Sequence, residues 1–177
     1  MAAISPDVLG RWFDAHAARM VLYARQWLDG DEARDAVQDV FCNAATLREP
    51  PRNGKAWLLR ATRNAAINRL RSRRRRKARH DAAPREDWFR PRGDDRPDPQ
   101  EVQQLVARLP EAQREVLVLR IWCEMTLREI ADLLGRPVST LFSQYRAALA
   151  TLKDRMQSRC PTNPCNSAAP SRNSKRR

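Results

Sequence analysis

The fold of the second half of the chain is decided by residues 126–152, which read TLREIADLLGRPVSTLFSQYRAALATL. Thr126 and Glu129 have the spacing of a capping box, in which each side chain accepts a hydrogen bond from the other residue's backbone N–H at a helix start. Gly135 has the position of a C-terminal helix stop. A short helix, a glycine-containing turn and a longer helix form the pattern of a helix-turn-helix, whose second helix enters the major groove of DNA. A simple helical hairpin is the alternative.

Apolar side chains recur at helical spacing on both sides of this turn, and they define the expected core of the second half. Before Pro110 they are Val102, Leu105, Val106 and Leu109. In the helix expected from about Glu111 they are Val116, Leu117 and Leu119. In the short helix they are Ile130, Ala131 and Leu134, and in the last one Leu141, Tyr145, Ala148, Leu149, Leu152 and Met156.

The first half of the chain predicts three more helices. The apolar face of the first, which should end near Gly30, consists of Leu9, Trp12, Phe13, His16, Met20, Tyr23, Ala24 and Trp27. The second buries Val37, Val40, Phe41, Ala44 and Leu47. The third runs from Ala56 to about Arg76, after a loop at 48–55, and its expected inner side is Trp57, Leu58, Ala61, Ala65 and Leu70. His16, on the apolar face of the first helix, is expected to be a core residue and not a metal ligand.

The third helix also carries a continuous polar stripe, formed by Arg60, Arg63, Asn64, Asn68 and Arg71. Arginine and asparagine suit phosphates and base edges, and Trp57 at the helix start is placed to stack on an unpaired base. A solvated helix face is the alternative for the stripe taken alone.

Positive charge is concentrated in this region. The chain has 34 Lys and Arg against 21 Asp and Glu, a formal charge of +13. Residues 48–79 contain 13 basic groups and 1 acidic group, whereas residues 1–47 have a net charge of −3 and residues 80–99 a net charge of −2. Such a localised excess favours a nucleic-acid partner over a generally basic surface.

The chain therefore divides into four parts. Two helical domains at 5–79 and 101–157 flank a Pro- and Asp-rich linker at 80–100, and a tail with the composition of disorder follows at 158–177. With five glycines in 177 residues, tight hairpins are disfavoured. The predicted fold class is all-α.

Several classes of function are disfavoured. The first 30 residues lack a signal-peptide core and no run approaches the ~20 apolar residues of a spanning helix, so a cytoplasmic chain without membrane insertion is expected. Cys42 and Cys123 are expected to be buried thiols, while Cys160 and Cys165 lie in the tail. Because neither a Cys/His cluster, a carboxylate cluster nor a phosphate-binding glycine loop occurs, no metal, cofactor or catalytic residue is expected, and the chain should not be an enzyme.

Taken together, the two halves resemble a bacterial RNA polymerase sigma factor of the extracytoplasmic-function type, which keeps only the second and fourth sigma regions. The family's core-binding helix resembles DEARDAVQDVFCNAA at 31–45. Its promoter-melting segment resembles KAWLLRATRNAAINRLRSRRRR at 55–76, and its region four resembles the segment at 109–152. The resemblance implies a region-two helical bundle and a region-four helix-turn-helix.

Residue roles follow from the resemblance. It implies that the clamp helices of the polymerase largest subunit bind Asp31, Asp35, Gln38, Asp39 and Phe41. It implies that the −10 element is bound and melted by Arg52, Asn53, Lys55, Trp57, Arg60, Arg63, Asn64, Asn68 and Arg71. It implies that the −35 element is read by Arg136, Ser139, Thr140, Phe142, Ser143, Gln144 and Arg146.

The implied partners are core RNA polymerase, including its flap region, promoter DNA and an anti-sigma factor; no homo-oligomer is expected. The linker matches the segment that follows the RNA path of the polymerase. Residues 139–144 lack two cations that most relatives carry at the start of this helix, so the phosphate contribution of the second domain should be reduced. A free-standing helix-turn-helix regulator and, more remotely, a nucleic-acid-processing enzyme are the alternatives.

Overall fold

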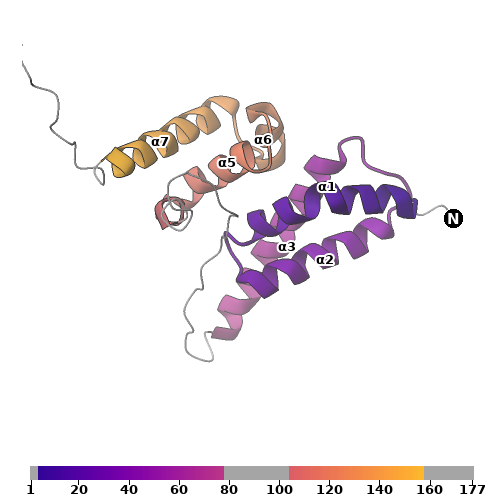
Figure 1. The fold of residues 1–177 in the computed structure, drawn as a ribbon. Helices are drawn as coiled ribbons and strands as arrows, with labels where there is room; N and C mark the ends of the chain where they lie inside the picture. The colour runs from indigo at the N-terminus through magenta and orange to yellow at the C-terminus, as the bar shows by residue number, and fades with distance from the viewer. Residues whose placement is uncertain (1–3, 78–103, 158–177) are drawn as a thin grey trace, which may run out of the picture.

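The computed structural model describes residues 4–77 and 104–157, which contain helices and no strand (Figure 1). The first group of helices comprises α1 (Pro6–Ala24), α2 (Gly30–Ala45) and α3 (Gly54–Lys77). The second comprises α5 (Glu111–Ile121), α6 (Leu127–Leu134) and α7 (Val138–Gln157), preceded by a helical turn at 104–107. The all-α, two-domain fold is confirmed. The predicted linker and tail, with Cys160 and Cys165, lie outside the described residues.

Local sequence signals set the helix boundaries. The Asp29 carboxylate accepts a hydrogen bond from the Glu32 N–H at 2.9 Å and so caps α2. The predicted capping box of α6 is present: Thr126 Oγ1 accepts from the Glu129 N–H at 3.2 Å, and the Glu129 carboxylate accepts from the Thr126 N–H at 2.7 Å. Gly135 ends α6 with a φ of +65°, a left-handed conformation that glycine adopts without strain. This turn directs the chain into α7.

In the first domain, α1, α2 and α3 pack as a bundle around buried side chains. Its largest fully buried side chains are Met20, Tyr23 and Leu58. The inner side of α3 differs from the prediction, because Leu58, Leu59, Thr62 and Ala66 are buried while Trp57, Ala61, Ala65 and Leu70 are only partly so. The helix is turned by about one residue because Leu58, Leu59 and Ala66 share one face, and this face packs into the apolar cluster with the side chains of α1 and α2.

Burial is wrongly predicted for four further residues. Phe13 is 54% exposed and lies over Phe41 with ring centroids 5.1 Å apart, because no further helix of the described chain covers that side of α1. Cys42 is exposed, although Cys123 is fully buried as expected. Leu149 and Met156 are 40% and 43% exposed on α7 because they project away from α5 and α6.

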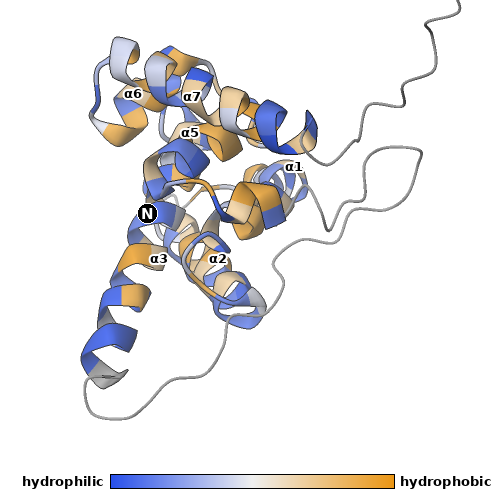
Figure 2. Ribbon diagram, turned by 90° about the vertical axis from the view of Figure 1, so that its left-hand side faces the viewer, coloured by the Kyte–Doolittle hydropathy of each residue, from blue (hydrophilic) through white to orange (hydrophobic). Residues whose placement is uncertain are grey.

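The second domain is built around α5, in which Val116, Leu117, Val118 and Leu119 have no exposed surface. Leu141 and Ala148 of α7 are buried and pack with these side chains of α5. The short helix α6 contributes Ile130 and Leu133, so Leu133 takes the buried place predicted for Leu134. The second helix of the predicted helix-turn-helix, α7, thus packs on α5 and α6. In the first domain, the hydrophilic end of α3 extends beyond the bundle (Figure 2).

Candidate nucleic-acid interface

The acidic side of α2 is exposed, as the expected polymerase-binding surface requires. Asp31, Asp35, Gln38 and Asp39 lie on this side. Phe41 differs: it is 7% exposed beneath Phe13 and offers little surface to a partner. A partner that approaches the Phe13–Phe41 ring pair would contact Phe13, which is not among the residues expected to bind the polymerase.

Arginines of α3 partly neutralise these carboxylates. Arg69 pairs with Asp39 and lies 3.9 Å from Asp35, while Arg73 reaches Glu32 at 3.1 Å and Asp29 at 3.6 Å. Exposed pairs of this kind contribute little to stability, since water screens them. A basic partner can therefore compete for the α2 carboxylates without disrupting the bundle.

On α3, the exposed polar stripe consists of Asn64, Asn68 and Arg71 with Arg60, whereas Arg63 is partly buried. Near the C-terminal end of the helix, an open hollow of about 450 Å³ is lined by Asn68, Arg71, Ser72, Arg74 and Arg75. Three guanidinium groups around one hollow favour an anion such as a phosphodiester.

The loop before α3 rests on an aromatic ring. A Cβ added at Gly54 would lie 2.5 Å from Cζ2 of Trp12, so only glycine allows this approach. Asn53 caps the helix by accepting from the Ala56 N–H at 3.0 Å, which commits its side-chain oxygen to a structural role. Arg52 remains exposed and Trp57 is half-buried.

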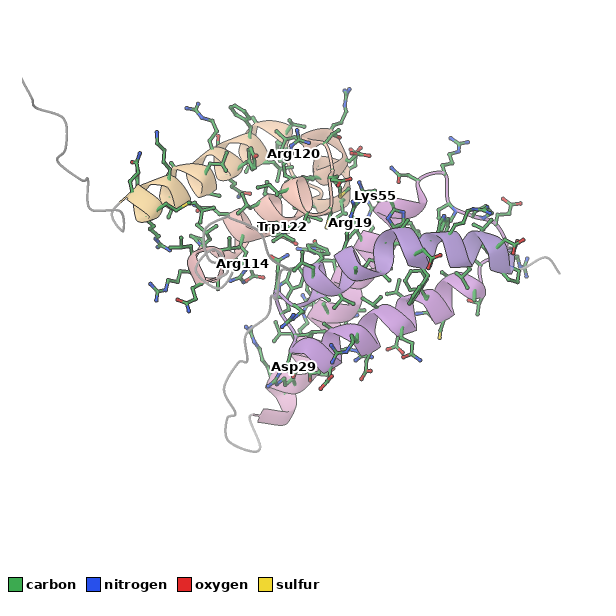
Figure 3. The ribbon with its side chains drawn as sticks, viewed as in Figure 1. Arg19, Asp29, Lys55, Arg114, Arg120 and Trp122 are labelled. Atoms are coloured by element: carbon green, nitrogen blue, oxygen red, sulfur yellow. The ribbon has the colours of Figure 1, made fainter. Side chains whose placement is uncertain are left out.

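Three cations that are expected to contact DNA form hydrogen bonds to the second domain in this structure. Lys55 Nζ donates to the Glu124 carbonyl at 2.9 Å, and an Arg60 guanidinium nitrogen donates to the Asp132 carbonyl at 2.5 Å. Arg63 Nε donates to the Glu115 carboxylate at 2.6 Å. Figure 3 shows Lys55 and the neighbouring Arg19 at the junction of the two helix groups.

Glu115 is the centre of this junction and was missed by the sequence analysis. It is 2% exposed, and besides Arg63 it accepts a hydrogen bond from the Tyr23 hydroxyl at 3.0 Å. Burial and the adjacent carboxylate raise the pKa of Tyr23 well above its usual value, so this hydroxyl keeps its proton. Burial opposes the charge of Arg63, yet the hydrogen bond and charge of Glu115 raise the pKa of Arg63.

Other residues of the junction were also not predicted. The Trp27 indole N–H donates to Glu111 at 2.8 Å, and Arg19 pairs with Glu124 at 2.7 Å. His16 lies nearby and is no core residue, since it is partly exposed; burial and then the charges of Lys55 and Arg19 lower its pKa. The sequence feature that could have indicated this junction is Glu115, a carboxylate directly before the apolar run at 116–119.

On α7, the predicted reading face is open. Its first two turns expose Ser139, Thr140, Phe142, Ser143 and Arg146, whereas Gln144 and, before the helix, Arg136 are partly buried. The Arg146 guanidinium lies 5.8 Å from the centre of the Phe142 ring. This face combines hydroxyls, one cation and an exposed aromatic ring.

None of the helices in 4–77 and 104–157 has the length and apolar character needed to cross a bilayer. In the same residues no group of His, Cys, Asp and Glu has the arrangement of a metal site.

Comparison with known proteins gives concordant matches for both domains. Residues 12–76 match the family model "Sigma-70 region 2", and residues 100–152 match "Sigma-70, region 4". The ECF RNA polymerase sigma factor RpoE of Cereibacter sphaeroides is 32% identical over 137 residues, which cover 71% of this chain and 72% of that protein.

Solved structures share the fold. The sigma factor RpoE in complex with the anti-sigma factor NepR from Bartonella quintana has a TM-score of 0.75 at 22% identity, with 88% of this chain and 100% of that one covered. CnrH in complex with the cytosolic domain of CnrY has a TM-score of 0.63 at 22% identity, with 89% and 92% covered.

Proposed function

Because the chain belongs to the extracytoplasmic-function RNA polymerase sigma factors, proteins of transcription initiation, we propose how its surfaces divide that work. The first domain binds core polymerase and opens the −10 element, and the second reads the −35 element. The observation that carries this division is that α3 and α7, the helices matched to the two regions, each expose polar side chains suited to DNA.

Core polymerase binds the exposed side of α2, with Asp31, Asp35, Gln38 and Asp39 facing the basic clamp helices. The support is their common exposure and the weak, screened pairs that hold Asp35 and Asp39 in the free chain. Charge complementarity of this kind speeds association and orients the partners.

The −10 element binds along α3. Asn64, Asn68 and Arg71 contact the separated strand, and the arginine-lined hollow holds its phosphates. Trp57 and the loop at 48–55, including Arg52, take the extruded base. Removing a base from the stack costs a few kcal/mol, which these contacts offset.

The −35 element binds the N-terminal turns of α7. Ser139, Thr140, Ser143 and Gln144 contact base edges, and Phe142 contacts a thymine methyl group. Arg136 and Arg146 supply the phosphate contacts, which are few for such a helix.

An anti-sigma factor is the proposed inhibitor. The support is that RpoE from Bartonella quintana, which has a similar fold, was solved in complex with the anti-sigma factor NepR. An inhibitor that covers either proposed DNA-binding face would prevent initiation.

Reconstitution with core polymerase tests the proposal. Asp35→Arg combined with Gln38→Arg should abolish co-elution with core polymerase in gel filtration, because two cations then face a basic surface. Asp7→Arg combined with Gly10→Arg, on the exposed side of α1, is the control and should still co-elute. Unchanged co-elution of the α2 variant, with helicity intact by circular dichroism, would contradict the docking surface.

A further inference from the structure

Two exposed apolar side chains lie among the polar groups at the start of α7. Val138 and Phe142 are 44% and 48% exposed, and their spacing of four residues makes them neighbours on the helix surface. They belong to its first two turns, and the N-terminal residues of such a helix contact base edges in a helix-turn-helix. The helix runs along the outer edge of the second domain (Figure 1), so this pair is open to a ligand.

The hydroxyl groups beside this pair discriminate poorly between bases. Ser139, Thr140 and Ser143 are exposed, and each hydroxyl both donates and accepts a hydrogen bond, so it pairs with either kind of base edge. The Ser143 hydroxyl also donates to the Ser139 carbonyl at 3.1 Å. These hydroxyls therefore hold the helix in the groove without fixing the base sequence.

Two longer polar side chains of α7 are held away from the bidentate contacts that identify a base. A glutamine reads adenine with both polar atoms of its amide, but Gln144 is partly buried and its Oε1 atom has almost no exposed surface. An arginine reads guanine with its guanidinium fork, but the Arg146 guanidinium lies over the Phe142 ring, 5.8 Å from its centre. Apolar contact is the discriminating chemistry that remains on this face.

Methyl groups are the apolar features of the major groove. Thymine carries a methyl group at C5 of its ring, and apolar side chains contact this group directly. Uracil and unmodified cytosine have only hydrogen at C5, whereas methylation of cytosine at C5 places a methyl group at the same point of the groove. A site that binds this methyl group therefore favours thymine over uracil and 5-methylcytosine over cytosine.

We propose that Val138 and Phe142 form a methyl-reading site, through which the second domain responds to the 5-methyl group of one pyrimidine in the −35 element. The proposal rests on the function assigned above to α7. It extends that function from base sequence to base modification, because methylation of a cytosine at this position strengthens the promoter contact without any change of sequence.

Substitution of single bases in the −35 element tests this site in the complex with core RNA polymerase. The complex first selects duplexes from a random library, which gives the sequence of the upstream element. Each thymine of that element is then replaced in turn by uracil, and affinities are compared by competition gel shift. One replacement should weaken binding about fourfold, the change expected when one methyl group is no longer buried. At that position 5-methylcytosine should bind about fourfold more tightly than cytosine.

Phe142→Ala and Leu149→Ala form a matched pair of variants. Both remove an exposed apolar side chain from α7, but Leu149 lies beyond the first two turns. With Phe142→Ala the thymine and uracil duplexes should bind equally, whereas Leu149→Ala should keep the fourfold preference. A preference that survives in Phe142→Ala, or that is absent from the wild type, would overturn the proposal.

The methyl-reading site and the function assigned to α7 fail in different ways. If the complex selects no upstream element, α7 does not read a −35 sequence and both are wrong. If an upstream element is selected and no uracil replacement in it weakens binding, the function of α7 stands and the methyl-reading site is refuted.

Discussion

Replacing Gly54 by alanine should destabilise the first domain, because a Cβ at this position would lie 2.5 and 2.8 Å from two ring atoms of Trp12. These separations are far below van der Waals contact, and the half-buried indole must move or the loop must shift. Overpacking of this kind costs about 1–3 kcal/mol. In helix interiors alanine is more favourable than glycine by ~1 kcal/mol of helix propensity. At the first residue of a helix only a fraction of this gain offsets the steric cost.

Gly10 provides the matched control. It lies inside α1, is exposed, and a Cβ there would meet nothing within 4 Å. Gly10→Ala should therefore stabilise the chain by about 0.5–1 kcal/mol through helix propensity. Urea titrations followed by circular dichroism give both free energies of unfolding. A Gly54→Ala variant as stable as the wild type, or a Gly10→Ala variant that loses stability, would refute the steric reasoning.

Three other predictions concern DNA and the capping box. Nonspecific DNA affinity should fall with salt at a log–log slope of about −4 if roughly five phosphates are neutralised, and a flat response in anisotropy titrations would contradict the role of residues 48–79. Asn64→Ala should impair strand opening more than initial binding; permanganate footprints of equal intensity to the wild type would exclude this. Hydrogen bonds from the Thr126 backbone and hydroxyl lower the pKa of Glu129 in the folded chain. The ionised carboxylate therefore stabilises the fold at pH values above the pKa of Glu129 in the unfolded chain, and this stabilisation is lost as the pH falls through its pKa in the folded chain. Glu129→Gln should accordingly be less stable than the wild type at pH 7, and the difference should close as the pH falls through the lowered pKa of Glu129 in the folded chain; a difference that persists in acid would contradict this.

Local features were predictable from the sequence because they depend on residues a few positions apart. The capping box of Thr126 and Glu129 and the stop at Gly135 are set by backbone hydrogen bonds within one helix, so their spacing sufficed. Periodicity also identified the helices. It could not tell how far a neighbouring helix covers each face, which is why Phe13 and Leu149 were expected inside and are exposed.

The candidate site was harder to predict because its contacts join distant residues. Asn64 and Asn68 were expected on an exposed stripe, and they are exposed. The bonds of Arg60 and Arg63 to Asp132 and Glu115 span 72 and 52 residues, and no pattern within one helix encodes them. Only the single carboxylate of Glu115 beside an apolar run indicated that a buried partner was needed.

Run-off transcription tests the central claim most directly. Core RNA polymerase is supplied with fragmented genomic DNA, with the chain or without it, and the transcripts are sequenced. The account predicts discrete transcripts that depend on the chain, share a two-part upstream sequence and weaken with Asn64→Ala. If the chain binds DNA but core polymerase gains no start-site specificity, the proposed assignment of its surfaces to promoter recognition and opening is contradicted.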